Sequence, residues 1–159
     1  MTDLLSNENR YLELVELPSE VHAPDLRPVR RYYIPWMCCR LRNGSNQPVF
    51  VYGPRHPSDA TTFPTFLFVL SPWSSTPWRW DCKGVLIPTD QNAVNGSSVV
   101  FGPVALKYRD LRRVTVSVRD GRYECPRSNG VLRRNQIDFA IPLTPYPELL
   151  SLPRRRVPV

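Results

Sequence analysis

The sequence predicts an all-β protein, a single antiparallel β-sandwich of about seven to eight strands with an extended or partly helical N-terminal arm. From residue 32 onward, short runs rich in β-branched and aromatic residues alternate with clusters of Gly, Pro, Asn and Ser. Within residues 113–119, apolar and polar side chains alternate, as in a strand with one buried face. No interior segment has a convincing helical period. Frequent short strands separated by turns are typical of sandwiches and barrels.

The expected strands lie, in order, in YYIPWMCCRLR, QPVFVYG, FPTFLFVLS, RWDCKGVLIP, SSVVFGPVALKY, RRVTVSVRDG, RYECP and QIDFAIPL. Val114, Val116 and Val118 should face the core from one strand. Three Asn-Gly or Asp-Gly pairs indicate tight turns, at residues 43–44, 120–121 and 129–130. Proline cannot donate to a sheet, so four prolines should mark strand ends, edges or bulges: Pro35, Pro72, Pro88 and Pro103.

Charge and proline content suggest three regions. Residues 1–28 form an acidic arm and Pro-rich linker, residues 29–146 the β-sandwich domain, and residues 147–159 a short basic tail that follows one helical turn at PELLS. Residues 1–25 hold six acidic residues and one arginine, whereas the whole chain has a net charge of +7. The arm is therefore expected to attract the basic body.

Composition excludes several classes of protein. No run of about 18 apolar residues exists, so no membrane-spanning helix is expected, and no secretory signal is visible at residues 1–20. A cytoplasmic, bacterial protein is the default interpretation, with export by another route left open. The four cysteines contain no C-x-x-C pair and should be free thiols, although export would allow a Cys82–Cys125 bridge. No metal and no cofactor are expected.

The stretch SPWSSTPWRWDC contains three of the four tryptophans. In an extended RWDCKG segment, Trp80 and Cys82 share an apolar face, and Asp81 and Lys83 share a charged one. We therefore expect Trp80 in the core and the loop residues Trp73 and Trp78 at a rim that binds a partner, together with Arg79 and Arg55. The alternative places both loop tryptophans over the end of the core. A sugar site using neighbouring polar residues has weaker support: Asp81, Asp90, Gln91 and Asn92.

Two further functions remain as alternatives. His56 and Asp59 lie in one loop and could perform acid–base chemistry in a small hydrolase or toxin domain, although no known catalytic motif surrounds them. Arginine pairs could bind nucleic acid or another anionic polymer, with Arg112, Arg133 and Arg134 as candidates. Neighbouring arginines on a strand face opposite sides, which weakens that hypothesis.

The leading hypothesis is a non-enzymatic protein–protein binding module that uses a Trp- and Arg-rich surface. Adaptors, chaperones of secreted proteins and immunity proteins all belong to this class, and the sequence does not select one of them. The partner would be another protein, because tryptophan and arginine contribute strongly to protein interfaces.

Overall fold

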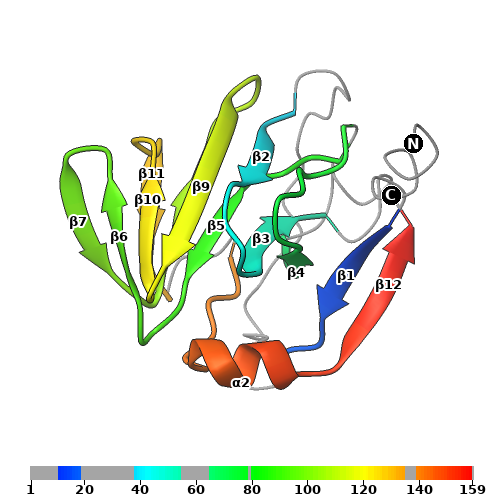
Figure 1. Ribbon diagram of the computed structural model, residues 1–159. Helices are drawn as coiled ribbons and strands as arrows, with labels where there is room; N and C mark the ends of the chain where they lie inside the picture. Colours follow the sequence, from blue (N-terminus) through cyan, green and yellow to red (C-terminus); the bar gives the residue numbers. More distant parts are fainter. Residues whose placement is uncertain (1–10, 19–37, 55–64, 79, 135–138, 159) are drawn as a thin grey trace.

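The alternating segment of the sequence forms the longest strand among the described residues. In the computed structural model, β9 (Arg113–Arg119) buries Val114, Val116 and Val118 and turns the intervening side chains outward. The structure describes residues 11–18, 38–54, 65–78, 80–134 and 139–158. Within these residues the fold is all-β, as the sequence predicts, and it consists of two sheets with one short helix (Figure 1).

The larger sheet has seven strands. In spatial order these are β11 (Gly130–Leu132), β8 (Val104–Lys107), β5 (Gly84–Ile87), β3 (Val49–Gly53), β4 (Phe66–Leu70), β1 (Tyr11–Val15) and β12 (Arg154–Pro158). All six pairings between these neighbouring strands are antiparallel. Because consecutive strands of the sequence are rarely neighbours here, the sheet depends on long-range pairing.

The smaller sheet has five strands, in the order β2 (Arg40–Asn43), β9, β10 (Arg122–Cys125), β6 (Asn92–Asn95) and β7 (Ser98–Phe101). The β2–β9 and β6–β10 pairings are parallel, so this sheet is mixed rather than antiparallel throughout. The β9–β10 hairpin turns at Asp120 and Gly121, which both have positive φ, as a type I′ turn requires. That turn was predicted.

The two sheets pack through one continuous apolar cluster to which both contribute, including Leu14, Val51, Phe68, Val116 and Tyr123. The other face of the seven-stranded sheet carries a second cluster, covered by α2 (Tyr146–Ser151) and residues 139–141. There Tyr52 stacks on Phe139 with ring centroids 4.6 Å apart, and its hydroxyl donates to the Ala140 carbonyl. The predicted helical turn at PELLS is α2.

The structure differs from the sequence-based expectation at both ends of the body. Residues 11–15 and 154–158, expected in an arm and a tail, are strands β1 and β12 of the larger sheet, paired from Tyr11↔Pro158 to Val15↔Arg154. Only Val157 among the β12 side chains is buried, so the run RRRVP gave little sign of a strand. The structure has twelve strands in its described part, more than the seven or eight expected.

Other local expectations were wrong for identifiable reasons. Asn43-Gly44 and Asn129-Gly130 do not close hairpins, because the strands before and after each pair belong to different sheets. Residues 139–143 form no strand beyond a single bridge between Phe139 and Thr65. The strand β6 was missed, since NAVN has only two apolar residues. Among the described residues, no helix is long and apolar enough to cross a membrane.

Candidate functional site

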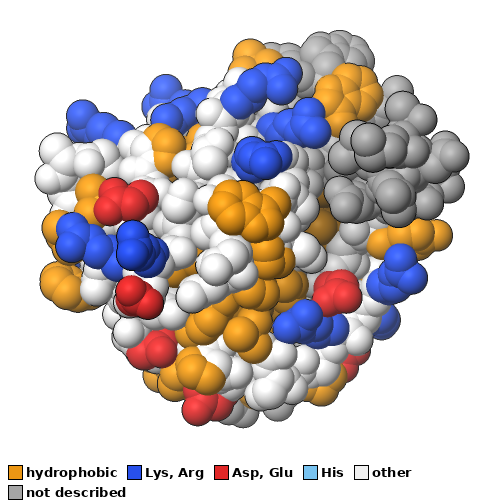
Figure 2. All heavy atoms as spheres, viewed as in Figure 1, with side chains coloured by type: hydrophobic (Ala, Val, Ile, Leu, Met, Phe, Trp, Pro, Cys, Tyr) orange, Lys and Arg blue, Asp and Glu red, His pale blue; other side chains and the backbone are white. Residues whose placement is uncertain are grey.

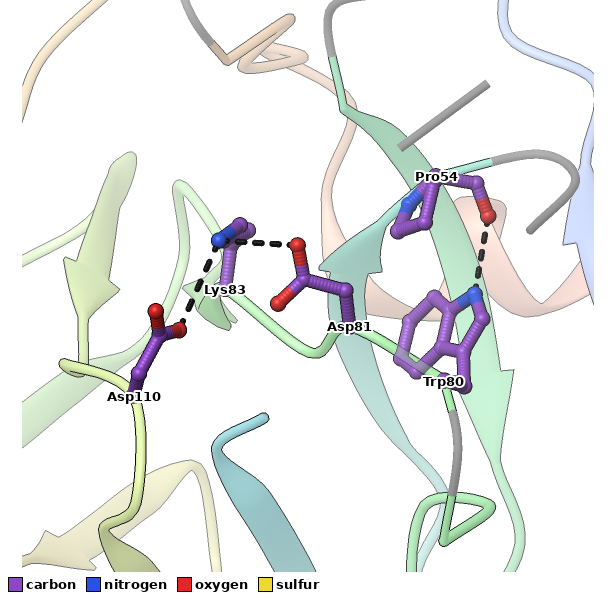
Figure 3. Close-up of polar contacts among 5 residues, drawn as sticks. All are labelled: Pro54, Trp80, Asp81, Lys83 and Asp110. Atoms are coloured by element: carbon purple, nitrogen blue, oxygen red, sulfur yellow. Dashed lines mark hydrogen bonds and ion pairs between the residues drawn. The ribbon is translucent and has the colours of Figure 1, made fainter. Parts of the chain in front are cut away.

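Trp80 lies inside the molecule, as predicted. Its side chain is 1% exposed and meets Phe68 edge to face, with ring centroids 5.0 Å apart. The indole nitrogen donates to the Pro54 carbonyl at 2.8 Å (Figure 3), so the polar atom of the ring is satisfied. A Cβ at Gly53 would overlap the Trp80 ring, so only glycine fits beside it. Trp80 is thus part of the core and unavailable to a partner.

Trp73 lies in a tight turn with its indole in solvent. The turn spans Ser71–Ser74, where the Ser74 amide and hydroxyl both donate to the Ser71 carbonyl, at 3.3 Å and 2.6 Å. Pro72 takes the second position of the turn, and Trp73 takes the third with φ of 60°. A positive φ at the third position is the geometry of a type II turn, in which glycine is preferred. A bulky aromatic residue there costs about 1–2 kcal/mol.

The side chain of Trp73 forms one wall of an open groove. The groove measures about 320 Å³ and is lined by β1, the end of β4, the turn after it and β12: Tyr11, Leu12, Glu13, Val69, Leu70, Ser71, Pro72, Trp73, Ser74, Ser75 and Arg156. We call it the Trp73 groove. Trp73 and Tyr11 are 58% and 45% exposed, which is unusual for two large aromatic rings bordering one hollow.

Arginines of β12 shape the wall formed by β1 and β12. The Arg156 guanidinium lies 4.5 Å from the centroid of the Tyr11 ring, a cation–π contact. Arg154 binds the Glu13 carboxylate at 2.9 Å and also donates to the Leu150 carbonyl at the end of α2. The Glu13 carboxylate in the groove lining is therefore neutralised, while Arg156 on the same face of the sheet remains exposed.

Trp78 is exposed as well, by 50%, but it does not line the Trp73 groove. It borders a smaller hollow of about 40 Å³ with Cys38, Arg40, Leu111 and Arg113. The segment between the two tryptophans is fixed against β2. The Thr76 backbone N–H donates to the Leu41 carbonyl, and the Leu41 backbone N–H donates to the Thr76 hydroxyl. The backbone N–H of Asn43 donates to the Ser74 carbonyl. The loop therefore presents two indoles at separate places instead of one continuous rim.

Asn43 does not line the Trp73 groove but binds the backbone of two residues that do, Leu70 and Ser71. Its side chain is fully buried, and its amide nitrogen donates to the carbonyls of Gln47, Leu70 and Ser71 at 2.7, 3.2 and 3.2 Å. Its oxygen accepts from the amide and hydroxyl of Ser45. One side chain thus connects the end of β2 to the end of β4, where the turn that carries Trp73 begins.

The charged face expected on the segment before β5 is not exposed to solvent. Asp81 is 3% exposed and lies 2.9 Å from the Lys83 ammonium, which also lies 3.7 Å from Asp110 (Figure 3). The buried carboxylate is balanced by a cation, as burial of charge requires. With Asp81 enclosed and Gln91 largely buried, the suggested sugar site loses two of its four polar residues.

The other candidate residues are only partly described. Arg55, His56, Asp59 and Arg79 lie outside the described residues. The Arg112 guanidinium lies 5.1 Å from the Tyr108 ring centroid and donates to the Arg127 carbonyl and to Asn129. Arg134 donates to the Ile141 carbonyl at 3.3 Å, and Arg133 is exposed. Arg112 and Arg134 therefore already have intramolecular acceptors.

The four cysteines are free thiols, with Cys39 rather than Cys125 directly opposite Cys82 in a β-bridge. Burial raises the pKa of the Cys38 thiol from 9.0 to about 12, and the carboxylates of Asp81 and Asp110 add to the effect. Cys82 also has a raised pKa, through its hydrogen bond with Cys39 and through burial. Thiols held protonated in this way are poor nucleophiles.

Cys125 should make the protein less stable in alkali. Burial, followed by the nearby Glu124 carboxylate, raises the pKa of its thiol from 9.0 to about 12. Between these values the unfolded chain loses a proton that the folded protein keeps, so stability falls as pH rises from about 9 to about 12. We expect the stability difference between wild type and Cys125→Ala to shift by about 1.4 kcal/mol per pH unit in that window. Urea unfolding measured across the window checks this, and parallel pH profiles for the two proteins would contradict it.

Within the part of the chain that the structure describes, no three side chains of His, Cys, Asp or Glu are grouped so that they could hold a metal ion. No protein-family model matches the chain, and no curated protein or solved structure is significantly similar to it.

Sequence reasoning found Trp73 but missed the residues that face it. Tyr11 and Arg156 are each more than 60 residues away from Trp73 in the sequence, and the β1–β12 pairing brings them together. A local signal for Tyr11 existed in the alternation of YLELV, where Tyr11 and Glu13 share one face and Leu12 and Leu14 the other. Nothing in the sequence around Arg156 indicated which residues it would contact.

Proposed function

We propose that the protein binds an extended, acidic segment of a partner protein in the Trp73 groove. The single observation that carries this proposal is the conformation of Trp73. A large aromatic side chain occupies a strained turn position and remains mostly in solvent, next to a hollow. Strain at an exposed position contributes nothing to the fold, and strained residues gather at binding sites.

The lining of the groove favours a protein segment as the ligand. Trp73 and Tyr11 contribute exposed aromatic rings, and Ser71, Ser74 and Ser75 also line the groove. Aromatic grooves of this kind receive extended and proline-containing peptides, whose backbone carbonyls need polar partners. The hydrogen bonds of Thr76 and Asn43 fix the loop in advance, which reduces the entropy lost on binding.

Charge favours an acidic segment. Arg156 is exposed in the lining of the groove, and Glu13 is already paired with Arg154. A partner carboxylate near Arg156 would therefore meet positive charge without repulsion. The chain as a whole also has a net charge of +7, which speeds the approach of acidic partners.

A nucleic acid is the competing ligand, because bases also stack on aromatic rings and phosphates also bind arginine. Figure 2 shows Lys and Arg side chains dispersed over one face, without the continuous band that tracks a phosphate backbone. Salt dependence separates the two ligands, since each neutralised phosphate adds about one unit to the slope of log affinity against log salt.

The variant Trp73→Gly tests this proposal most directly, because it separates the effect on binding from the effect on stability. Glycine suits the positive φ of the turn, so we expect the free energy of unfolding to stay constant or rise by up to about 1 kcal/mol. Loss of the indole should weaken partner binding by about 2 kcal/mol, or roughly 30-fold. Calorimetric titration and urea unfolding measure the two quantities. A less stable variant that still binds would contradict the assignment of Trp73.

The matched control is Trp78→Ala, which removes an equally exposed indole from the other hollow. As probes we suggest a synthetic peptide of alternating glutamate and proline, the same peptide with lysine in place of glutamate, and an oligothymidylate. Saturable binding of the glutamate peptide that is lost in Trp73→Gly and kept in Trp78→Ala supports the proposal. Preference for the lysine peptide, or tighter binding of the oligothymidylate with a steep salt slope, would overturn it.

A further inference from the structure

The edge strand β7 is exposed in a way that the other sheet edges are not. Val99 and Phe101 are 54% and 69% exposed on its outer face, while Val100 packs against the core from the inner face. The strand Ser98–Phe101 contains no charged residue and no proline. Edge strands usually carry such residues because they prevent pairing with another chain.

Each of the other three edges in the described chain has protection. The edge strand β12 carries three consecutive arginines and Pro158. β11 is only three residues long and is followed by Arg133 and Arg134. The free side of β2 is covered by residues 74–76, through the hydrogen bonds of Asn43 and Leu41. β7 is four residues long, one more than β11, and it differs from the other edges in having no charged residue within it or in the two positions that follow it.

The register of the β6–β7 hairpin shows which backbone groups of β7 are free to pair. Gly102 donates to the Gln91 carbonyl, and Val100 lies opposite Ala93 two residues earlier. Since hydrogen-bonded and non-hydrogen-bonded pairs alternate in an antiparallel ladder, Ser98 and Val100 bond to β6. The N–H and C=O groups of Val99 and Phe101 therefore point away from β6, toward the open edge.

We propose that β7 pairs antiparallel with β7 of a second copy of this chain, joining two five-stranded sheets into one. The two-fold axis passes through Val100, so Val99 of each copy lies opposite Phe101 of the other. In this register the outward-pointing groups form two hydrogen-bonded pairs. It also creates two valine–phenylalanine cross-strand contacts, one of the pairings that stabilise sheets.

A second copy fits this edge better than an acidic or basic partner does. The chain carries +7, so two copies repel at most surfaces, but β7 itself adds no charge to the contact. On the outer face, Val94 of β6 continues the apolar strip, and the next strand, β10, carries Arg122 and Glu124 as an ion pair with a 4.0 Å separation. Neutral, apolar and self-complementary strands favour an isologous contact.

This contact is independent of the proposed partner groove. The Trp73 groove is lined by residues of the seven-stranded sheet and its adjoining turn, whereas β7 is the edge of the five-stranded sheet. Loss of self-association should leave peptide binding unchanged, and Trp73→Gly should leave self-association unchanged. Failure of one proposal is therefore visible without failure of the other.

Sedimentation equilibrium over a range of concentrations tests the contact. The average mass of the wild type should rise from 18.4 kDa toward twice that value. The double variants Val99→Lys/Phe101→Lys and Val99→Glu/Phe101→Glu should each remain monomeric, because like charges would lie opposite one another across the pair. An equimolar mixture of the two should associate again. Wild type that stays monomeric up to millimolar concentration, or a mixture that stays monomeric, would overturn the proposal.

Leu143 provides the matched control, because it is 52% exposed and lies outside β7. Leu143→Lys and Leu143→Glu should both associate like wild type. If they lose the association while the β7 variants keep it, the contact lies elsewhere and the proposal is wrong.

Amide exchange tests the register residue by residue. The amides of Ser98 and Val100 should be protected at every concentration, since they bond to β6 within one chain. Protection of the Val99 and Phe101 amides should increase at least tenfold as the protein concentration passes through the association range. Protection at Val99 and Phe101 that does not change with concentration would overturn the β7 pairing.

Discussion

Replacing Trp80 with alanine is expected to lower the free energy of unfolding by about 3–5 kcal/mol, which is the usual range for removing a large aromatic side chain from a core. Trp80 contacts Phe68 and Gly53 inside the sandwich, and its indole nitrogen satisfies the Pro54 carbonyl. The variant leaves a cavity and one buried carbonyl without its donor. Urea unfolding monitored by circular dichroism measures the loss.

Trp73→Ala is the comparison for this prediction, because it removes the same side chain from solvent. Its effect on stability should stay within about 0.5 kcal/mol, as for most surface substitutions. Equal losses in the two variants would mean that Trp73 also contributes to the core, and the groove would then lose its exposed wall.

Asn43→Ala is expected to cost about 2–4 kcal/mol and to weaken partner binding at the same time. The substitution removes five hydrogen bonds in a fully buried position, which the side chain makes with Gln47, Leu70, Ser71 and Ser45. It also removes one of the hydrogen bonds to the Ser71 carbonyl, at the start of the turn that carries Trp73. Binding should therefore decrease although Asn43 does not line the groove.

Two variants show whether this effect comes from the buried hydrogen bonds. Asn46→Ala changes an exposed asparagine in the same loop and should have little effect on stability or binding. Asn43→Asp keeps the acceptor for Ser45 and loses the three donated bonds, so it should resemble the alanine variant. A mild effect of Asn43→Ala, similar to that of Asn46→Ala, would show that the network does not support the groove.

The strands that could be predicted are those whose pattern is complete within a few residues. The alternation at Val114, Val116 and Val118 and the Asp120-Gly121 turn specify a hairpin without reference to the rest of the chain. The runs around Phe50, Phe68 and Val85 are apolar enough to be buried strands. The run RRRVP is different, because it becomes a strand only through its pairing with β1, which no local pattern encodes.

The candidate site was predictable only in part, for the same reason. Local spacing predicted that Trp80 is buried, which its 1% exposure confirms, whereas it left open whether Trp73 and Trp78 lie at a rim or cover the core. Predicting the Trp73 groove would have required knowing that Tyr11 and Arg156 line it, and long-range strand pairing brings them there. Asp81 and Lys83 were expected on a solvent-exposed face, but their ion pair allows Asp81 to be buried and Lys83 to be partly buried.

The pairing of β1 with β12 also bears on the order in which the protein folds. The pairing of Tyr11 with Pro158 closes a loop of nearly the whole chain, so it has a large entropic cost of loop closure. The β9–β10 and β6–β7 hairpins close over short distances and can form early. During folding, the edge strand β7 would therefore be exposed before β1 and β12 pair and complete the Trp73 groove. Folding at low temperature should separate these two stages in time.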